Sequence, residues 1–187
     1  MTQRIIVGIS GASGIQYGVR ALQLLRECGL ETHLVMSKSA ELTLHYEMDM
    51  SFDEVKGLAH TVHAIKNVGA SIASGSFQTA GMLIAPCSVR TMSEIATGVT
   101  STLLTRAADV TLKERRLLVL MVRETPLHTG HLRTMTSLSE MGAVIAPPMP
   151  AFYTRPETLD QVVTQSTART LELFGLAPEA LLRWQGG

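Results

Sequence analysis

Short, uninterrupted apolar segments alternate along the chain with longer segments in which apolar residues recur every three or four positions. A short apolar segment predicts a strand that is covered on both faces, whereas the wider spacing predicts one face of a helix, as for Ile15, Val19 and Leu22. The predicted strands are Arg4 to Ser10, Glu31 to Met36, Met82 to Ala85, Leu117 to Val122 and Ala143 to Ala146. The later predicted helices are Lys38 to Tyr46, Leu103 to Arg115, His131 to Met141 and Pro156 to Phe174. This alternation predicts an α/β fold with a doubly wound parallel sheet.

In two segments the apolar residues do not recur at a regular spacing. Ser51 to Phe77 mixes polar residues with scattered apolar positions and is predicted to be mostly loop. Pro147, Pro148 and Pro150 form a second irregular segment directly after a predicted strand, where loops build the ligand crevice of open α/β sheets. No repeat or linker composition divides the 187 residues, so a single domain over residues 1–187 is expected.

The charge balance limits the classes of partner. Sixteen Lys plus Arg match sixteen Asp plus Glu, so no overall field favours nucleic acid or an anionic membrane. No signal-peptide pattern or membrane-spanning apolar segment is seen, and Cys28 and Cys87 show no disulfide or metal-ligand spacing. A cytoplasmic protein is therefore expected. Only 17% of residues are charged, which favours burial of surface between subunits.

The segment Gly8 to Gly14 combines small residues with the start of a predicted helix. Small residues let backbone amides approach a ligand, and the positive end of a helix dipole favours an anion, so this turn predicts a nucleotide phosphate site. Ser10 replaces the middle glycine of the dinucleotide fingerprint, and no acidic residue follows the second strand at Met36-Ser37-Lys38. NAD is therefore disfavoured.

Cations occur at two places from which they could bind a phosphate, provided that the fold brings them together. Arg106 and Lys113 lie seven positions apart, on one face of a predicted helix. Arg123 and Glu124 directly follow a predicted strand, at the end where loops build active sites. Arg and Lys converging on one point would bind phosphate through charge-assisted hydrogen bonds, and Tyr153 could donate another.

Other chemistry-bearing residues give weaker signals. Glu47 stands alone, and an isolated carboxylate is more often a solvated surface residue. The six histidines lack the spacings of a catalytic metal site, so no metal is expected. Cys87 is interpreted as a small buried hydrophobe, because nothing adjacent would lower its pKa.

Five strings taken together resemble the flavin prenyltransferase family, the UbiX-type proteins long described as aromatic acid decarboxylase subunits. The ordered match spans about Arg4 to Trp184, and the ending Arg183-Trp184-Gln185-Gly186 is most similar to the phenolic acid decarboxylase branch of that family. The strings are GISGASGIQYG, VMSKSAE, IAPCSVRTMSEIATG, RAADVTLKERRLLVLMVRETP and PPMPAFYTRPETLDQVV.

The resemblance implies a Rossmann-like (flavodoxin-like) subunit that transfers a dimethylallyl group from dimethylallyl phosphate to N5 and C6 of reduced FMN. The product, prenylated FMN, would serve a separate UbiD-type decarboxylase, and the subunit would form a large homo-oligomer, a dodecamer. By motif match, FMN would contact Gly11, Ala12, Ser13, Ser37, Ser88, Thr91 and Arg123. The prenyl phosphate would be held by Arg106, Lys113, Glu124, Tyr153 and Arg169, and Ser13, Glu47 and Glu124 would be catalytic, with Glu47 paired to Ser13.

Some residues depart from the family pattern. Arg133 and Thr134 follow His131-Leu132 where the family carries an acid and Asn, and Val89-Arg90 replaces smaller residues. Rival functions are a flavin-dependent cysteine decarboxylase, a non-catalytic flavin-carrying subunit and a nicotinamide reductase. The first is expected to carry an Asn that Pro147 to Phe152 lacks, and the last is weakened by the missing ribose acid.

Overall fold

The computed structural model describes residues 3–186, in which six parallel strands form one sheet with the order β3-β2-β1-β4-β5-β6. This confirms the predicted doubly wound α/β fold. The strands are β1 (Arg4–Ile9), β2 (Glu31–Met36), β3 (Thr61–His63), β4 (Gly81–Cys87), β5 (Leu117–Val122) and β6 (Ala143–Ile145). The helices are α1 (Ile15–Glu27), α2 (Lys38–Glu47), α3 (Phe52–Lys56), α4 (Val89–Ala96), α5 (Leu103–Lys113), α6 (Thr129–Glu140) and α7 (Leu159–Leu171), with short 3₁₀ turns η1 (Ser71–Ala73), η2 (Phe152–Thr154) and η3 (Glu172–Phe174).

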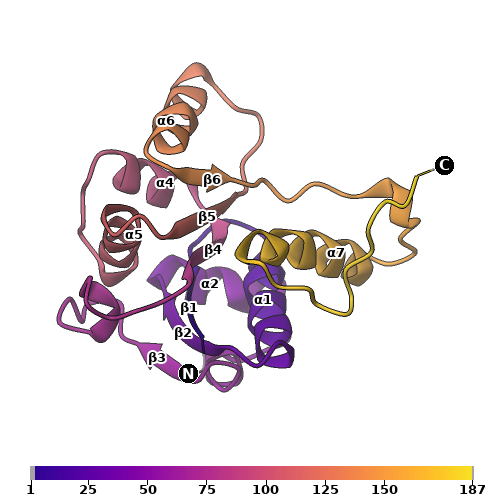
Figure 1. The fold of residues 1–187 in the computed structure, drawn as a ribbon, viewed down its shortest axis with the longest axis horizontal. Helices are drawn as coiled ribbons and strands as arrows, with labels where there is room; N and C mark the ends of the chain where they lie inside the picture. The colour runs from indigo at the N-terminus through magenta and orange to yellow at the C-terminus, as the bar shows by residue number, and fades with distance from the viewer. Residues whose placement is uncertain (1–2, 187) are drawn as a thin grey trace.

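Helices cover both faces of the sheet (Figure 1). Because successive strand residues point to opposite faces, Ile5 and Val7 of β1 belong to a core cluster with residues of α1, α2, α3 and α7, whereas Ile6 belongs to a second cluster with residues of α4, α5 and α6. The central strands β1, β2, β4 and β5 are therefore buried on both sides, which explains why they contain uninterrupted apolar segments. Within the described residues, no helix is both long enough and apolar enough to cross a membrane.

The segment 51–77, predicted to be mostly loop, contains α3, the edge strand β3 and η1. The prediction was wrong for two physical reasons. Helix α3 has only five residues, too few to show a period, and it is started by a capping box between Ser51 and Glu54. Strand β3 pairs with β2 alone and is only partly covered, so it lacks the apolar character of the central strands.

Several predicted boundaries also shift, among them those of α7, α6 and β4. Helix α7 begins at Leu159 and not at Pro156, because Thr158 caps it with Gln161 in a capping box. Helix α6 begins at Thr129, since the Nδ1 of His128 accepts hydrogen bonds from the first turn. Strand β4 continues past Ala85 to Cys87, and there it regains its pairing with β5 after a register shift.

The segment after β6 extends away from the sheet beside α7, and the chain returns along it to the C-terminal end (Figure 1). This arm is defined by residues 147–158 and 177–186. The side chain of Gln165 anchors it through hydrogen bonds with the backbone of Leu182, at 2.7 Å to the carbonyl and 3.0 Å from the amide. Large apolar side chains on the arm, those of Met149, Phe152 and Trp184, remain exposed.

Candidate functional site

A cavity of about 610 Å³ lies at the carboxyl edge of the sheet. Its walls come from the segments that directly follow β1, β2, β3, β4 and β5, together with α4 and the first residues of α5. Because parallel strands all end at the same edge, segments far apart in sequence meet here. The lining residues are Gly11, Ala12, Ser13, Ser37, Lys38, Ser39, Ile65, Lys66, Ser88, Val89, Arg90, Thr91, Glu94, Ser101, Thr102, Leu104, Thr105, Arg123 and Glu124.

Ser10 fixes the floor of the predicted phosphate turn. Its buried hydroxyl donates a hydrogen bond to the carbonyl of Pro86 at 2.9 Å and accepts one from the amide of Ser88 at 2.7 Å. One side chain therefore links the ends of β1 and β4. Gly11 comes next, and a Cβ at this position would overlap the Cβ of Ser39 at the start of α2. Only glycine permits this close approach of the two cavity walls.

Glu47 performs a structural task at the start of α1. Its Oε2 accepts hydrogen bonds from the amides of Gly14 at 2.8 Å and Ile15 at 3.1 Å. A carboxylate is stabilised there by the positive end of the helix dipole. Among the described residues, no hydrogen bond joins Glu47 to the hydroxyl of Ser13, which lines the cavity without Glu47. The amides of Gly14 and Ile15 therefore donate their hydrogen bonds to Glu47, while Gly11 to Ser13 line the cavity.

Two serines at strand ends cap the helices that follow them. The hydroxyl of Ser37 accepts a hydrogen bond from the amide of Ala40 at 3.1 Å, and that of Ser88 accepts one from the amide of Thr91 at 3.3 Å. The α5 helix also starts at the cavity, with Thr102 as its cap. Several helix N-termini therefore converge on one cavity, which favours an anionic ligand group.

The ionisable groups of the cavity reinforce this preference for anions. Four cations and two carboxylates line the cavity, which leaves a formal charge of +2. They are Lys38, Lys66, Arg90 and Arg123, and Glu94 and Glu124. Arg123 also acts on Tyr17: burial raises the pKa of this phenol above its usual value, and the nearby guanidinium partly opposes the shift. Cys87 lies just below the cavity, and burial raises its thiol pKa to about 12, so it stays protonated.

Four of the residues assigned to the prenyl phosphate do not line this cavity. Arg106 pairs with Asp109 at 2.6 Å, and Lys113 pairs with Glu114 at the far end of α5, about 16 Å along the helix from its start at the cavity. Tyr153 donates to the carbonyl of Leu182 at 3.2 Å in the arm. Arg169 pairs with Glu172 at 2.9 Å and borders a smaller cavity of about 260 Å³ under the proline segment.

Eight of the predicted site residues line the cavity of a single chain: Gly11, Ala12, Ser13, Ser37, Ser88, Thr91, Arg123 and Glu124. The other five do not line it: Glu47, Arg106, Lys113, Tyr153 and Arg169. Sequence reasoning missed Lys38, Lys66 and Glu94. Lys38 follows a predicted strand, a signal that could have been used. Lys66 lies in the segment 51–77, whose apolar residues show no regular spacing, and the spacing around Glu94 does not mark it as a site residue. Across residues 3–186, no group of three or more His, Cys, Asp or Glu side chains is placed to hold a metal ion.

Comparison with known proteins identifies the family of this chain. The family model for Flavoprotein matches residues 1–170. The flavin prenyltransferase UbiX of Thauera aromatica is 58% identical over 183 residues, covering 98% of this chain and 94% of that protein. The flavin prenyltransferase UbiX of Escherichia coli (strain K12) is 59% identical over 187 residues, covering 98% and 99%.

Solved structures show the same similarity. A crystal structure of AnUbiX (PadA1) in complex with FMN and dimethylallyl pyrophosphate matches with a TM-score of 0.99 and 45% identity, covering 100% of both chains. A dodecameric FMN-dependent Ubix-like decarboxylase from Escherichia coli O157:H7 matches with a TM-score of 0.96 and 49% identity, covering 98% of this chain and 100% of that one. The FMN-dependent cysteine decarboxylase TvaF, at 15% identity and a TM-score of 0.65, shares the fold alone. The chain belongs to the Flavoprotein family and, within it, to the UbiX-type flavin prenyltransferases.

Proposed function

We propose that this protein transfers a dimethylallyl group from dimethylallyl phosphate to N5 and C6 of reduced FMN. The observation that carries the proposal is the cavity at the carboxyl edge, where helix N-termini, small residues and Arg123 converge in a chain 59% identical to a flavin prenyltransferase. The cavity volume of about 610 Å³ lies within the range of small-molecule and cofactor sites.

The residues present fit a flavin mononucleotide. Its phosphate monoester carries about two negative charges near neutral pH, which matches the formal charge of +2 on the cavity walls. We propose that the amides of Gly11 to Ser13 and the hydroxyl of Ser37 bind this phosphate, and that Ser88, Thr91 and Arg123 orient the ring. When bound in its reduced form, the flavin supplies the electron-rich nitrogen and carbon that accept the prenyl group.

The leaving group of the prenyl donor is the second phosphate to be held. The bond between the allylic carbon and the phosphate oxygen breaks with its electron pair on oxygen, so negative charge grows on the phosphate. Cations preorganised around that oxygen stabilise the developing charge. Arg123 is a cation of the cavity that could serve this purpose, whereas the carboxylate of Glu124 adds negative charge, and a net charge of +2 does not neutralise two phosphates.

We therefore propose that Arg106, Lys113, Tyr153 and Arg169 reach the cavity from neighbouring copies in a homo-oligomer. Three observations support this arrangement. None of these residues lines the cavity of its own chain, the arm that carries Tyr153 extends from the sheet with exposed apolar side chains, and a relative with 49% identity is a dodecamer.

Formation of the second bond requires removal of a proton from the ring carbon. We propose that Ser13 relays this proton together with Glu47, which binds the amide of the next residue, Gly14, and that Glu124 assists at the phosphate. The product would pass to a UbiD-type decarboxylase. Both cysteines are free thiols, which suits the cytoplasmic location that we propose.

The deciding experiment is anaerobic incubation of the purified protein with reduced FMN and dimethylallyl phosphate, followed by mass spectrometry of the extracted flavin. We expect the mass of FMN plus the prenyl group, and the same incubation with oxidised FMN serves as the control. A flavin mass unchanged from FMN would refute the proposed activity and favour a non-catalytic flavin-carrying subunit.

A further inference from the structure

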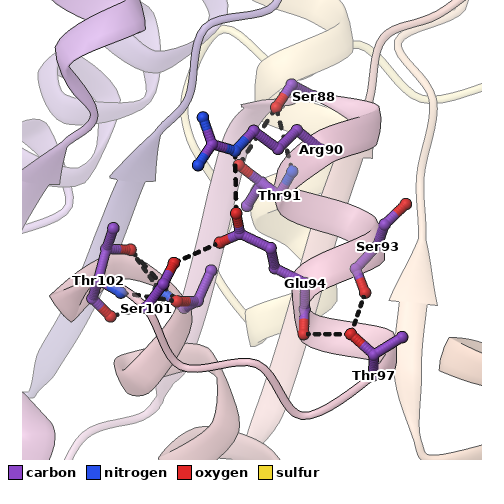
Figure 2. A network of polar contacts seen from close by, with 9 residues as sticks. Ser88, Arg90, Thr91, Ser93, Glu94, Thr97, Ser101 and Thr102 are labelled. Carbon is purple, nitrogen blue, oxygen red and sulfur yellow. Dashed lines mark hydrogen bonds and ion pairs between the residues drawn. The ribbon is translucent and has the colours of Figure 1, made fainter.

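Glu94 is a carboxylate in a cavity that otherwise favours anions. It projects from α4 and its side chain is 19% exposed. Both of its oxygens are occupied: Oε1 accepts a hydrogen bond from Nε of Arg90 at 2.9 Å, and Oε2 accepts one from the hydroxyl of Ser101 at 3.0 Å (Figure 2). Arg90 neutralises the charge that would repel a phosphate, and the second oxygen binds the segment between α4 and α5.

The backbone of Glu94 binds the same segment. Its carbonyl accepts hydrogen bonds from the amide of Val99 at 2.9 Å and from the hydroxyl of Thr97 at 3.3 Å. Gly98, with φ of 70°, allows the chain to turn back at this point. Glu94 therefore holds residues 97–101 at two points. Its backbone carbonyl binds Thr97 and Val99, and its carboxylate binds Ser101.

Ser101 leads directly into two other parts of the cavity wall. Thr102, the next residue, caps α5 by reciprocal hydrogen bonds of 3.3 Å with Thr105. The amide of Leu103 then donates to the carbonyl of Ile65 at 2.9 Å, next to Lys66. The carboxylate of Glu94 is thus connected through Ser101 to a wall that includes Thr102, Thr105 and Lys66.

We propose that Glu94 is a positioning residue for this wall, and that its two side-chain hydrogen bonds, with Arg90 and with Ser101, set the affinity of the cavity for FMN. The proposal rests on FMN being the ligand, as in the proposed function. It assigns no proton transfer to Glu94, because both oxygens already accept hydrogen bonds within the protein.

The test compares Glu94→Ala, Glu94→Gln and Ser101→Ala with the control Glu140→Ala, an exposed glutamate at the end of α6. FMN affinity is measured by quenching of flavin fluorescence without prenyl donor, and the order of residues 97–103 by amide hydrogen exchange. We expect Glu94→Ala to weaken FMN binding about tenfold, as loss of a hydrogen bond to a charged group does, and to speed exchange in this segment.

The side-chain amide introduced by Glu94→Gln can still bond both neighbours, so this variant is expected to stay within about threefold of wild type, with Ser101→Ala between the two. At saturating FMN, kcat should change little while KM for FMN rises.

Unchanged FMN affinity and exchange in Ser101→Ala would overturn the proposal, even if Glu94→Ala failed to fold. Equal weakening by Glu94→Gln and Glu94→Ala would also overturn it, because the cause would then be charge. A wild-type protein that binds FMN but forms no adduct would refute the proposed function and leave this test valid.

Discussion

Replacing Ser10 by alanine should show how strongly one buried hydroxyl stabilises the floor of the cavity. The substitution removes the donor to the Pro86 carbonyl and the acceptor for the Ser88 amide. The Pro86 carbonyl keeps a second hydrogen bond, from the backbone amide of Ser10 at 3.2 Å. The Ser88 amide has no other hydrogen-bond partner among the described residues and would be left without one.

The expected cost follows from this asymmetry. An unsatisfied donor inside a protein costs about 1–3 kcal/mol, and the part-buried Ser88 amide is placed within this range, whereas the carbonyl loses only one of its two bonds. We expect Ser10→Ala to lower the free energy of unfolding by about 2 kcal/mol. For a chain of this size, that corresponds to a fall in Tm of about 4–8 °C. FMN binding should weaken as well, because Ser88 lines the cavity.

Differential scanning calorimetry of wild type, Ser10→Ala and Ser139→Ala measures this effect. Ser139 is exposed on α6, and its replacement should change the free energy of unfolding by less than about 0.5 kcal/mol. A Tm for Ser10→Ala within about 1 °C of the control would mean that the link between β1 and β4 contributes nothing measurable to stability, which would refute this expectation.

Three further predictions concern the site and the sheet edge. Arg123→Ala and Lys113→Ala should each abolish prenylation in the adduct assay while circular dichroism shows a folded protein; wild-type rates in both would refute the phosphate assignment. Glu47→Gln should keep the hydrogen bonds to α1, lower the free energy of unfolding by about 1 kcal/mol, and slow closure of the new flavin ring, which stopped-flow absorbance follows; an unchanged closure rate would exclude the relay. Burial lowers the pKa of both His33 and His63, which are joined by a hydrogen bond of 3.0 Å, so their contribution to stability should be complete above pH about 6.5 and be lost as pH falls below it. Urea unfolding against pH should show a smaller acid loss in His63→Gln than in wild type, and equal losses would contradict this account.

Much of the architecture could be predicted from the sequence because each central strand is covered on both faces. Glu31–Met36 and Leu117–Val122 were predicted with the observed boundaries, since their apolar character reflects that burial directly. Edge strand β3 was not predicted, because its residues are only partly covered and its short length hides any alternation. The first residue of α7 depends on the cap at Thr158, a side-chain hydrogen bond that outweighs the signal from Pro156.

The site divides in the same way. Residues that directly follow a strand, such as Ser37, Ser88 and Arg123, were predictable, because parallel strands end at one edge and their loops meet there. Glu94 and Lys66 depend on how α4, the α4–α5 segment and the β3 segment pack together, and no local spacing encodes that contact.

The sequence alone was sufficient to predict the four central strands, most of the helices and the turn from Gly8 to Gly14, since these features follow from local burial and backbone requirements. The folded structure places the Glu47 carboxylate at the start of α1, and it places Lys113 about 12 Å along α5 from Thr105, which lines the cavity. The physical reason is that hydrogen bonding and distance between residues far apart in sequence depend on the packing of whole elements.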